Sequence, residues 1–379
     1  MIPRRVLHLV DTFGARSQTF VYTFVTNHQL FEAQVLCRQR DLPVEFPFEP
    51  VVTIPETWSR RHPARWWSTV ARRVTGRTPW QRRIEAAVRV SAPDVVHAHF
   101  GQVGTRVLPA MQRLSPPLVT SFYGLDATGF ANSPAGRAAL PALFAFGALF
   151  LAEGPVLRHR LIGLGAPADR VRLVPIAVDL SKYPAWSLEH GDPVVLFVAR
   201  FVEKKGLPDA IEAFAAARTA HPTLRMRIIG DGPEQQRGEA AAVRCGVAHA
   251  IEWLGPRPHA EVINHLLRAA VLIQPSLTAE DGDTEGGAPT TLIEAQAIGI
   301  PIVATKHADI PHVAPAGPGI HLADERDVRS LAAGLARLVS APASSASAGV
   351  RERHDIRHVM PLLEGCYLEA LATANRSAA

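Results

Sequence analysis

The sequence has few cysteines and no long apolar run, and these two absences exclude several classes of protein. Only three cysteines occur in 379 residues, and none has a C-x-x-C spacing (Cys37, Cys245 and Cys366). We therefore expect neither a disulfide framework nor a cysteine zinc site, and a reducing cytoplasm fits best. No stretch approaches the roughly 18 consecutive apolar residues of a membrane span. Met1–Arg5 leads only into the short apolar run Val6–Val10, so no export signal is predicted.

Acidic residues are missing from one segment, although they nearly balance the basic residues overall. The formal net charge is +5, from 40 Lys and Arg against 35 Asp and Glu. Trp58–Arg83 contains eight Arg, no Lys and no acidic residue, so it alone carries +8 and leaves −3 for the other 353 residues. Because the basic charge is confined to one segment, we do not expect a nucleic-acid-binding protein.

The same segment is rich in tryptophan, and two interpretations remain open. It holds four of the six tryptophans (Trp58, Trp66, Trp67 and Trp80). Interleaved Arg and Trp residues suit an anionic membrane surface, with about 1 kcal/mol of attraction per Arg. In the other interpretation the indole rings pack on the protein and the Arg side chains are solvated.

Short β-branched runs alternate with amphipathic stretches along both halves of the chain. The predicted strands of the first half are Val6–Val10, Ala33–Cys37, Asp94–Phe100, Leu118–Tyr123, Ala148–Ala152 and Val171–Ile176. Those of the second half are Val194–Ala199, Met226–Ile229, Ile251–Leu254, Val271–Gln274, Pro301–Thr305 and Ile320–Ala323. This βαβ alternation predicts parallel sheets with right-handed crossovers.

A Pro- and Gly-containing stretch without periodicity separates the two halves. The predicted fold class is α/β, with two Rossmann-like doubly wound domains facing a cleft. We expect an amino-terminal domain over residues 1–183, a linker over 184–193 and a second domain over 194–355. The helical segment 356–379 is expected to pack back on the first domain. Ligands of such sheets bind beyond the carboxyl ends of the strands, so the cleft is the expected active site.

Two predicted strand ends in the second half carry residues suited to a phosphate ligand. Arg200 and Lys205 follow one strand, and Gly206 and Pro208 suit the helix start after them. Two such cations fit a diphosphate, although solvated surface charge would look the same. Gly230 and Gly232 follow the next strand and allow a ligand to approach the backbone, although an Asp-Gly-Pro turn is the simpler interpretation.

The segment from Thr278 to Thr305 is the richest in polar groups and glycine. A Gly-rich loop leads into a helix predicted to begin near Pro289 and to end at Gly299, and its amino terminus suits an anion. Glu294 lies about one turn into that helix, where its carboxylate suits sugar hydroxyls rather than phosphate. The acidic residues before it also fit a solvated loop, and they lack the remaining ligands of a calcium loop.

In the first half, two strand ends carry histidines and an aspartate. Alternation places His97 and His99 on one face of a strand, where a metal pair competes with hydrogen-bonded or buried histidines. Without a third ligand at a useful spacing, the metal site is the weaker interpretation. Tyr123 and Asp126 follow the next strand, and Asp126 suits either a bound sugar or a turn cap.

Together these motifs resemble the retaining, two-Rossmann-domain (GT-B) glycosyltransferases of family 4, over nearly the whole chain. Residues 199–206, Ala-Arg-Phe-Val-Glu-Lys-Lys-Gly, are similar to the family's G-R-L-x-x-x-K-G, and 229–233 to its I-G-x-G-P. Residues 17–20, Ser-Gln-Thr-Phe, resemble the S-E-T-F of members that build exopolysaccharides. Residues 97–101 resemble H-A-H-F-G, and 174–179 resemble V-P-N-G-V-D.

The resemblance implies roles for particular residues. Arg200 and Lys205 would hold the donor diphosphate and Glu294 the ribose. Charge stabilisation of the leaving group, without a metal or other cofactor, would carry the transfer with retention. The donor-binding candidates are Arg200, Lys205, Gly230, Gly232, Gly286, Gly287, Ala288, Pro289, Thr290 and Glu294. The catalytic candidates are Glu285, Asp126 and His99, and the acceptor-side candidates are Gly14, Ser17 and Tyr123.

The sequence departs from the family pattern at several positions. Eight residues separate Glu285 from Glu294, where the family usually has seven, so Glu294 is the firmer assignment. Tyr123 stands where the family's H-G-x-D motif has a His. Ala199 and Ala177 replace two family glycines, and both are small substitutions.

The cysteine usage predicts a cytoplasmic enzyme, and the membrane interpretation of Trp58–Arg83 would make it peripheral at the inner face of the membrane. By the resemblance, it would move a sugar from a nucleotide sugar, a UDP-sugar being favoured, to a glycan or lipid-linked acceptor in cell-surface or exopolysaccharide biosynthesis. Transfer to a small molecule, or epimerisation or hydrolysis of a nucleotide sugar on the same frame, remains the alternative.

Overall fold

The computed structural model describes residues 3–55, 79–184, 193–341 and 347–378. Most of Trp58–Arg83 and nearly all of the expected linker 184–193 lie outside these residues. The chain divides into two compact units, which are described separately. Unit 1 comprises Met1–Glu153, Arg158–Val174 and Val359–Ala379, and unit 2 comprises Gly154–Leu157 and Pro175–His358.

A parallel sheet of seven strands forms the centre of unit 1. Its order is β3-β2-β1-β4-β5-β6-β7, the doubly wound order in which the third, second and first strands precede the fourth. The strands are β1 (Arg4–Phe13), β2 (Phe31–Arg40), β3 (Val51–Thr53), β4 (Val95–His99), β5 (Leu118–Phe122), β6 (Leu149–Ala152) and β7 (Val171–Leu173). All residues of β4 and β5 are buried, as expected for parallel strands covered on both faces.

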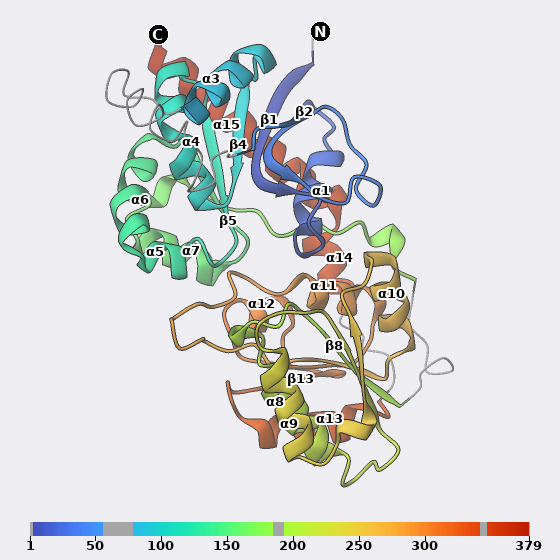
Figure 1. Ribbon diagram of the computed structural model, residues 1–379. Coiled ribbons are helices and arrows are strands. Elements are labelled where there is room, and N and C mark those ends of the chain that lie inside the picture. Colours follow the sequence, from blue (N-terminus) through green and yellow to red (C-terminus); the bar gives the residue numbers. More distant parts are fainter. Residues whose placement is uncertain (1–2, 56–78, 185–192, 342–346, 379) are drawn as a thin grey trace. The chain divides into compact units, whose positions relative to one another are not determined.

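Helices cover the two faces of this sheet. Their bounds are α1 (Thr19–Thr26), α3 (Pro79–Ser91), α4 (Gly101–Leu114), α5 (Gly129–Asn132), α6 (Pro134–Phe146), α7 (Pro155–Gly163) and α15 (Ile356–Ala378). Figure 1 shows α3, α4 and α6 grouped beside the sheet. On β5, Thr120 faces Gly104 of α4, whereas the neighbouring residue Ser121 points to the opposite face. On that face Tyr367 of α15 contacts His97 of β4, so α4 and α15 cover opposite faces.

Unit 2 is built around a second parallel sheet, of six strands in the order β10-β9-β8-β11-β12-β13. The strands are β8 (Val194–Val198), β9 (Arg225–Ile229), β10 (Ile251–Gly255), β11 (Val271–Gln274), β12 (Ile302–Thr305) and β13 (Ile320–Ala323). Its helices are α8 (Leu207–Ala217), α9 (Gln235–Arg244), α10 (His259–Arg268), α11 (Thr290–Ile298), α12 (Ile310–Val313), α13 (Val328–Leu338) and α14 (Ser347–His354).

Apolar faces of helices close the core of unit 2. Phe197 of β8, Phe214 of α8 and Leu335 of α13 are fully buried in one cluster. Helices α8, α9 and α13 lie together in Figure 1, and α8 contacts both of the others. The sheet is thereby fixed, and the loops at its carboxyl end carry the polar residues of interest.

The two doubly wound parallel sheets predicted from the sequence are confirmed. Every predicted strand occurs, with ends shifted by a few residues, but the three-residue strand β3 was missed. It follows Pro50 at the edge of the sheet and is too short to show alternation. The helix predicted over 356–379 is α15, and its residues from Val359 onward belong to unit 1. Among the described helices, none combines the length and apolarity needed to cross a bilayer.

Candidate functional site

The loop after β8 brings two lysines against the loop that follows β11. The Lys205 ammonium lies 2.6 Å from Glu285 Oε1. Lys204, which is buried, lies 3.0 Å from Asp283 Oδ2 and donates to the Thr284 carbonyl at 2.7 Å. Gly206 makes the close approach feasible, because its φ is +64° and a Cβ there would lie 2.1 Å from the Pro275 carbonyl oxygen.

The lysines control the ionisation of Glu285. Burial opposes the charged carboxylate, but the charges of Lys205 and Lys204 outweigh burial and lower the pKa of Glu285 to about 2. Burial in turn lowers the pKa of Lys205, an effect that the Glu285 charge opposes. The result is a buried ion pair in which each charge requires the other.

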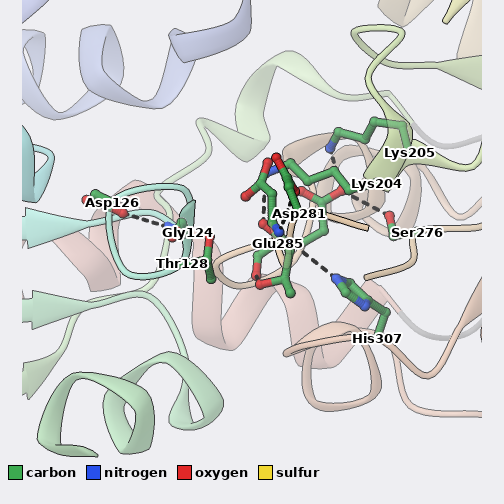
Figure 2. Close-up of polar contacts among 11 residues, drawn as sticks. Gly124, Asp126, Thr128, Lys204, Lys205, Ser276, Asp281, Glu285 and His307 are labelled. Carbon is green, nitrogen blue, oxygen red and sulfur yellow. Dashed lines mark hydrogen bonds and ion pairs between the residues drawn. The ribbon is translucent and has the colours of Figure 1, made fainter. Parts of the chain in front are cut away.

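Two side chains other than the lysines also hold Glu285 in place. Figure 2 shows Ser276 and His307 approaching Glu285 from different segments. The Ser276 hydroxyl donates to Glu285 Oε1 at 3.0 Å, and the Glu285 backbone N–H donates to His307 Nε2 at 3.0 Å. Because His307 Nε2 accepts, its Nδ1 carries the proton and donates to Glu325 at 2.6 Å. Sequence reasoning missed Lys204, Ser276 and His307; their positions at strand ends were the available signal.

The Gly-rich loop ends in α11, where the sequence predicted a helix. Residues 286–289 are buried, Thr290 is the first helical residue, and Gly299 ends the helix with φ +93°. The loop thus places backbone N–H groups at the amino terminus of α11, close in sequence to the ion-paired Glu285. Such a terminus favours a bound anion.

Glu294, one turn further along α11, is buried and hydrogen-bonded by two side chains of unit 2. The Tyr183 hydroxyl donates to Glu294 Oε1 at 3.1 Å, and His259 Nε2 donates to the same oxygen at 2.7 Å. Neither partner was predicted from the sequence, because both come from distant segments.

Arg200 and the two turn glycines differ in their surroundings. Arg200 is exposed at the start of the loop that follows β8. A Cβ on Gly230 would lie 1.8 Å from the Ala199 carbonyl oxygen, and one on Gly232 would lie 2.5 Å from that of Phe201. The Phe201 N–H also donates to the Asp231 carbonyl at 2.6 Å. The glycines therefore let two strand-end loops pack together, which favours the turn interpretation.

Unit 1 contains a hydrogen-bonded chain of histidines beneath the carboxyl end of its sheet. His8 Nδ1 lies 2.9 Å from His99 Nε2, and His8 Nε2 lies 2.9 Å from His28 Nε2. His28 Nδ1 lies 3.1 Å from Glu364 Oε1, and His99 Nδ1 lies 2.8 Å from the Tyr123 hydroxyl. We call these five residues the histidine chain.

Glu364 fixes the proton positions in the histidine chain. Burial opposes its ionisation, but hydrogen bonds from His28 and the backbone lower the pKa of Glu364. The carboxylate only accepts, so His28 Nδ1 carries a proton. In the neutral form of this ring, His28 Nε2 accepts from His8 Nε2–H. His8 Nδ1 then accepts from His99 Nε2–H, and the Tyr123 hydroxyl donates to His99 Nδ1. Every donor in the chain thus has one acceptor.

The ring nitrogens of His8, His97 and His99 also lie close enough to suggest a metal site, with ligand atoms within 4.8 Å of one another. Each of these nitrogens already has a hydrogen-bond partner, however. His97 bonds the Tyr367 hydroxyl at 2.6 Å and the Ser121 hydroxyl at 2.7 Å. Burial lowers the pKa of all three, to about 3 for His99, so the rings stay neutral. Hydrogen bonding accounts for the cluster without an ion.

Asp126 joins the loops that follow β4 and β5. Its carboxylate is fully buried and accepts from the backbone N–H groups of Gly101 at 2.9 Å and Tyr123 at 3.0 Å. It also accepts from the backbone N–H of Gly124 at 2.9 Å (Figure 2). Burial raises the pKa of Asp126, and these hydrogen bonds oppose the rise. The arrangement favours a loop-capping role over the catalytic role expected from the sequence.

The remaining acceptor-side candidates lie in the segment after β1. Gly14 is buried with φ +86°, and a Cβ there would lie 2.2 Å from the Asp41 carbonyl oxygen. Ser17 is exposed in the short turn before α1. Among the site residues predicted from the sequence, Tyr123 is hydrogen-bonded to His99 within unit 1, and Lys205 forms an ion pair with Glu285 within unit 2.

Two family profiles match the chain in succession. Residues 19–182 match the profile described as Glycosyltransferase Family 4, and residues 182–355 match that of Glycosyl transferases group 1. The chain belongs to this family of glycosyltransferases. The first profile covers most of the seven-stranded sheet and the second covers the six-stranded sheet, so the family and the fold agree.

Relatives in this family include proteins of bacterial polysaccharide synthesis. The chain is 35% identical over 255 residues to the putative colanic acid biosynthesis glycosyltransferase WcaL of Salmonella typhimurium, covering 65% of this chain and 63% of the relative. It is 32% identical over 251 residues to the amylovoran biosynthesis glycosyltransferase AmsK of Erwinia amylovora, covering 65% and 61%. The matched region therefore spans less than two thirds of each relative.

Several solved structures share the fold at low identity. Anabaena HepE, solved with UDP and glucose, superposes with a TM-score of 0.79 at 17% identity, over 96% of this chain and 98% of that one. Sucrose-phosphate synthase of Thermosynechococcus elongatus gives a TM-score of 0.72 at 15% identity, over 98% and 100%. These likenesses establish the two-domain GT-B fold.

Proposed function

We propose that this protein transfers a sugar, with retention of anomeric configuration, from a UDP-sugar to a glycan or lipid-linked acceptor in exopolysaccharide biosynthesis. The observation that carries the proposal is the pairing of Lys205 with Glu285 beside the Gly-rich start of α11. The family membership and the names of the relatives support the reaction class, and UDP in HepE supports the donor class.

The donor diphosphate would interact with cations and with the helix terminus of unit 2. Lys205 supplies a nearly buried ammonium, and exposed Arg200 supplies a guanidinium with bidentate geometry. Both stabilise negative charge, as does the amino terminus of α11. Because that charge grows on the leaving group as the sugar–phosphate bond breaks, these groups would lower the barrier without a metal or other cofactor.

The two glutamates would have separate tasks. A carboxylate repels phosphate, so Glu285 and Glu294 suit hydroxyl groups of the donor. Glu294 would accept from the ribose, and Glu285, held at a pKa of about 2 by its lysine partners, would face the transferred sugar as a carboxylate. Ligand binding between Lys205 and Glu285 would have to replace their ion pair with new contacts.

The acceptor would bind at the carboxyl edge of the unit 1 sheet. Tyr123, at the end of β5, and Ser17, before α1, supply hydroxyl groups there. A lipid-linked acceptor would explain the Arg- and Trp-rich segment as a contact with the inner membrane surface. Of that segment the structure describes only the start of α3, where Trp80 lines a cavity with Leu9 and Val103. Trp80 therefore packs on unit 1.

A thermal-shift panel of UDP, GDP, ADP and their sugars tests this function. UDP and UDP-sugars should raise the unfolding temperature. In a separate turnover assay, the sugar should leave the donor only when an acceptor glycan or lipid is present. A panel in which no nucleotide stabilises the protein would contradict the proposal. Free sugar or an epimer formed without acceptor would instead indicate a hydrolase or epimerase.

A further inference from the structure

Glu294 has an unusual pair of partners for a buried carboxylate. Its side chain is 5% exposed, yet the nearest hydrogen-bond donors are a phenol and an imidazole rather than an arginine or lysine. Both donors bind Oε1. Among the described residues, no hydrogen bond to Oε2 is formed, so one oxygen of a buried carboxylate remains open.

The partners come from two different segments and are themselves well held. Tyr183 is 6% exposed and follows the short helical turn Leu180–Lys182, and its N–H bonds the Leu180 carbonyl. His259 is the first residue of α10. The two rings meet edge to face, with centroids 6.4 Å apart. Glu294 is therefore fixed by contacts from α10 and from the chain before β8.

The chemistry of the partners leaves the charge of Glu294 available to a ligand. Burial and the Glu294 charge raise the pKa of Tyr183, so its hydroxyl keeps the proton that it donates. His259 places its Nε2–H on Oε1, where two donors occupy the two lone pairs. A lysine or arginine would neutralise the carboxylate, whereas these groups orient it and leave Oε2 to accept further hydrogen bonds.

We propose that Tyr183 and His259 are positioning residues that set Glu294 Oε2 to accept from the ribose hydroxyls of a nucleoside diphosphate. The inference rests on the proposed function and deepens it: the orientation of Glu294 makes the site selective for ribonucleotides over 2′-deoxyribonucleotides. Loss of either partner frees the carboxylate to rotate, so selectivity falls while the phosphate contacts persist.

Calorimetry with UDP and 2′-deoxy-UDP tests the inference on the full chain. A hydrogen bond to a charged group contributes about 1.5 kcal/mol or more, so the native protein should bind UDP roughly tenfold more tightly than 2′-deoxy-UDP. In Tyr183→Phe and in His259→Asn this ratio should fall to about threefold or less, mainly through weaker UDP binding. Glu294→Gln should bring it close to one.

Matched controls keep the test specific. Tyr22→Phe removes a hydroxyl that donates to the Pro47 carbonyl in unit 1, and His265→Asn changes another histidine of α10. Both should keep the native ratio. Far-ultraviolet circular dichroism should match in all variants, because each substitution keeps a side chain of similar size.

Three results would overturn the inference. An unchanged UDP to 2′-deoxy-UDP ratio in Tyr183→Phe and His259→Asn would show that neither residue orients Glu294. Equal weakening of both nucleotides would show a general structural role. Binding of neither UDP, GDP nor ADP by the native protein would refute the proposed function as well, whereas either of the first two results would leave it intact.

Discussion

Units 1 and 2 share a strand order but fill the carboxyl ends of their sheets with different chemistry. In unit 1 the buried polar groups there are mainly neutral: His8, His97 and His99 are fully buried and hydrogen-bonded. In unit 2 they are charged, with Lys204 and Lys205 paired to Asp283 and Glu285. Hydrogen bonds between neutral side chains fix the shape of the carboxyl end of a sheet, whereas paired charges can exchange partners with a bound anion. The difference therefore supports a donor site in unit 2.

The largest effect should follow from removing the cation of unit 2. Lys205→Ala leaves Glu285 buried without its closest cation, and it also removes a charge for the diphosphate. UDP affinity should fall by roughly 10- to 100-fold, as expected for a charged hydrogen bond. Calorimetry measures the change. Lys182→Ala is the matched control, because that lysine is exposed, and equal affinity in both variants would remove Lys205 from the site.

The next effect concerns the anchor of the histidine chain. Glu364 accepts from His28 Nδ1 and from the backbone N–H groups of Gln29 and Leu30. Glu364→Ala leaves these donors buried and unpaired, so unit 1 should lose about 3–5 kcal/mol of unfolding free energy. Urea denaturation measures it. The exposed Glu352→Ala should change stability by less than about 0.5 kcal/mol, and a similarly small effect at Glu364 would contradict the assigned chain.

Acidification should have a smaller effect, which is to lower the stability of unit 1 more than that of unit 2. The folded pKa of His99, about 3, lies below its ordinary value of 6.5, so the unfolded chain binds more protons below pH 6.5. Stability from this neutral histidine is complete above that pH and falls by up to about 1.4 kcal/mol per pH unit below it. Glu285, with a pKa of about 2 against 4.5, loses its contribution only below pH 4.5.

Hydrogen exchange at pH 7.5 and pH 5.5 measures this separation. Protection should decrease more in β4 of unit 1, where burial lowers the pKa of His8, His97 and His99, than in β12 of unit 2, where burial lowers the pKa of His354 to about 4. Equal losses in both strands would contradict the contrast between neutral and charged edges.

Local signals in the sequence predicted much of the fold. Pro289 and Gly299 marked the ends of α11, and alternation placed His97 and His99 on one face of β4. The strands at the centres of both sheets were found for the same reason, since their apolar runs are continuous. These features depend on residues within a few positions of one another.

Features that depend on distant residues were not predicted. Glu364 lies 336 positions from His28, and Tyr183 lies 111 positions from Glu294, so no spacing pattern connects them. The packing of Gly230 against the Ala199 carbonyl likewise joins two loops that are distant in the sequence. Packing across the sheet, which a sequence does not display, decided each of these cases.

The central claim is that unit 2 holds the diphosphate of the donor, and the affinities of UDP and uridine test it most directly. Calorimetry on the native protein should give UDP a dissociation constant at least about 100-fold below that of uridine, because two charged contacts add about 3 kcal/mol. In Lys205→Ala this advantage should shrink to about tenfold or less. Equal affinities of UDP and uridine for the native protein would contradict the account.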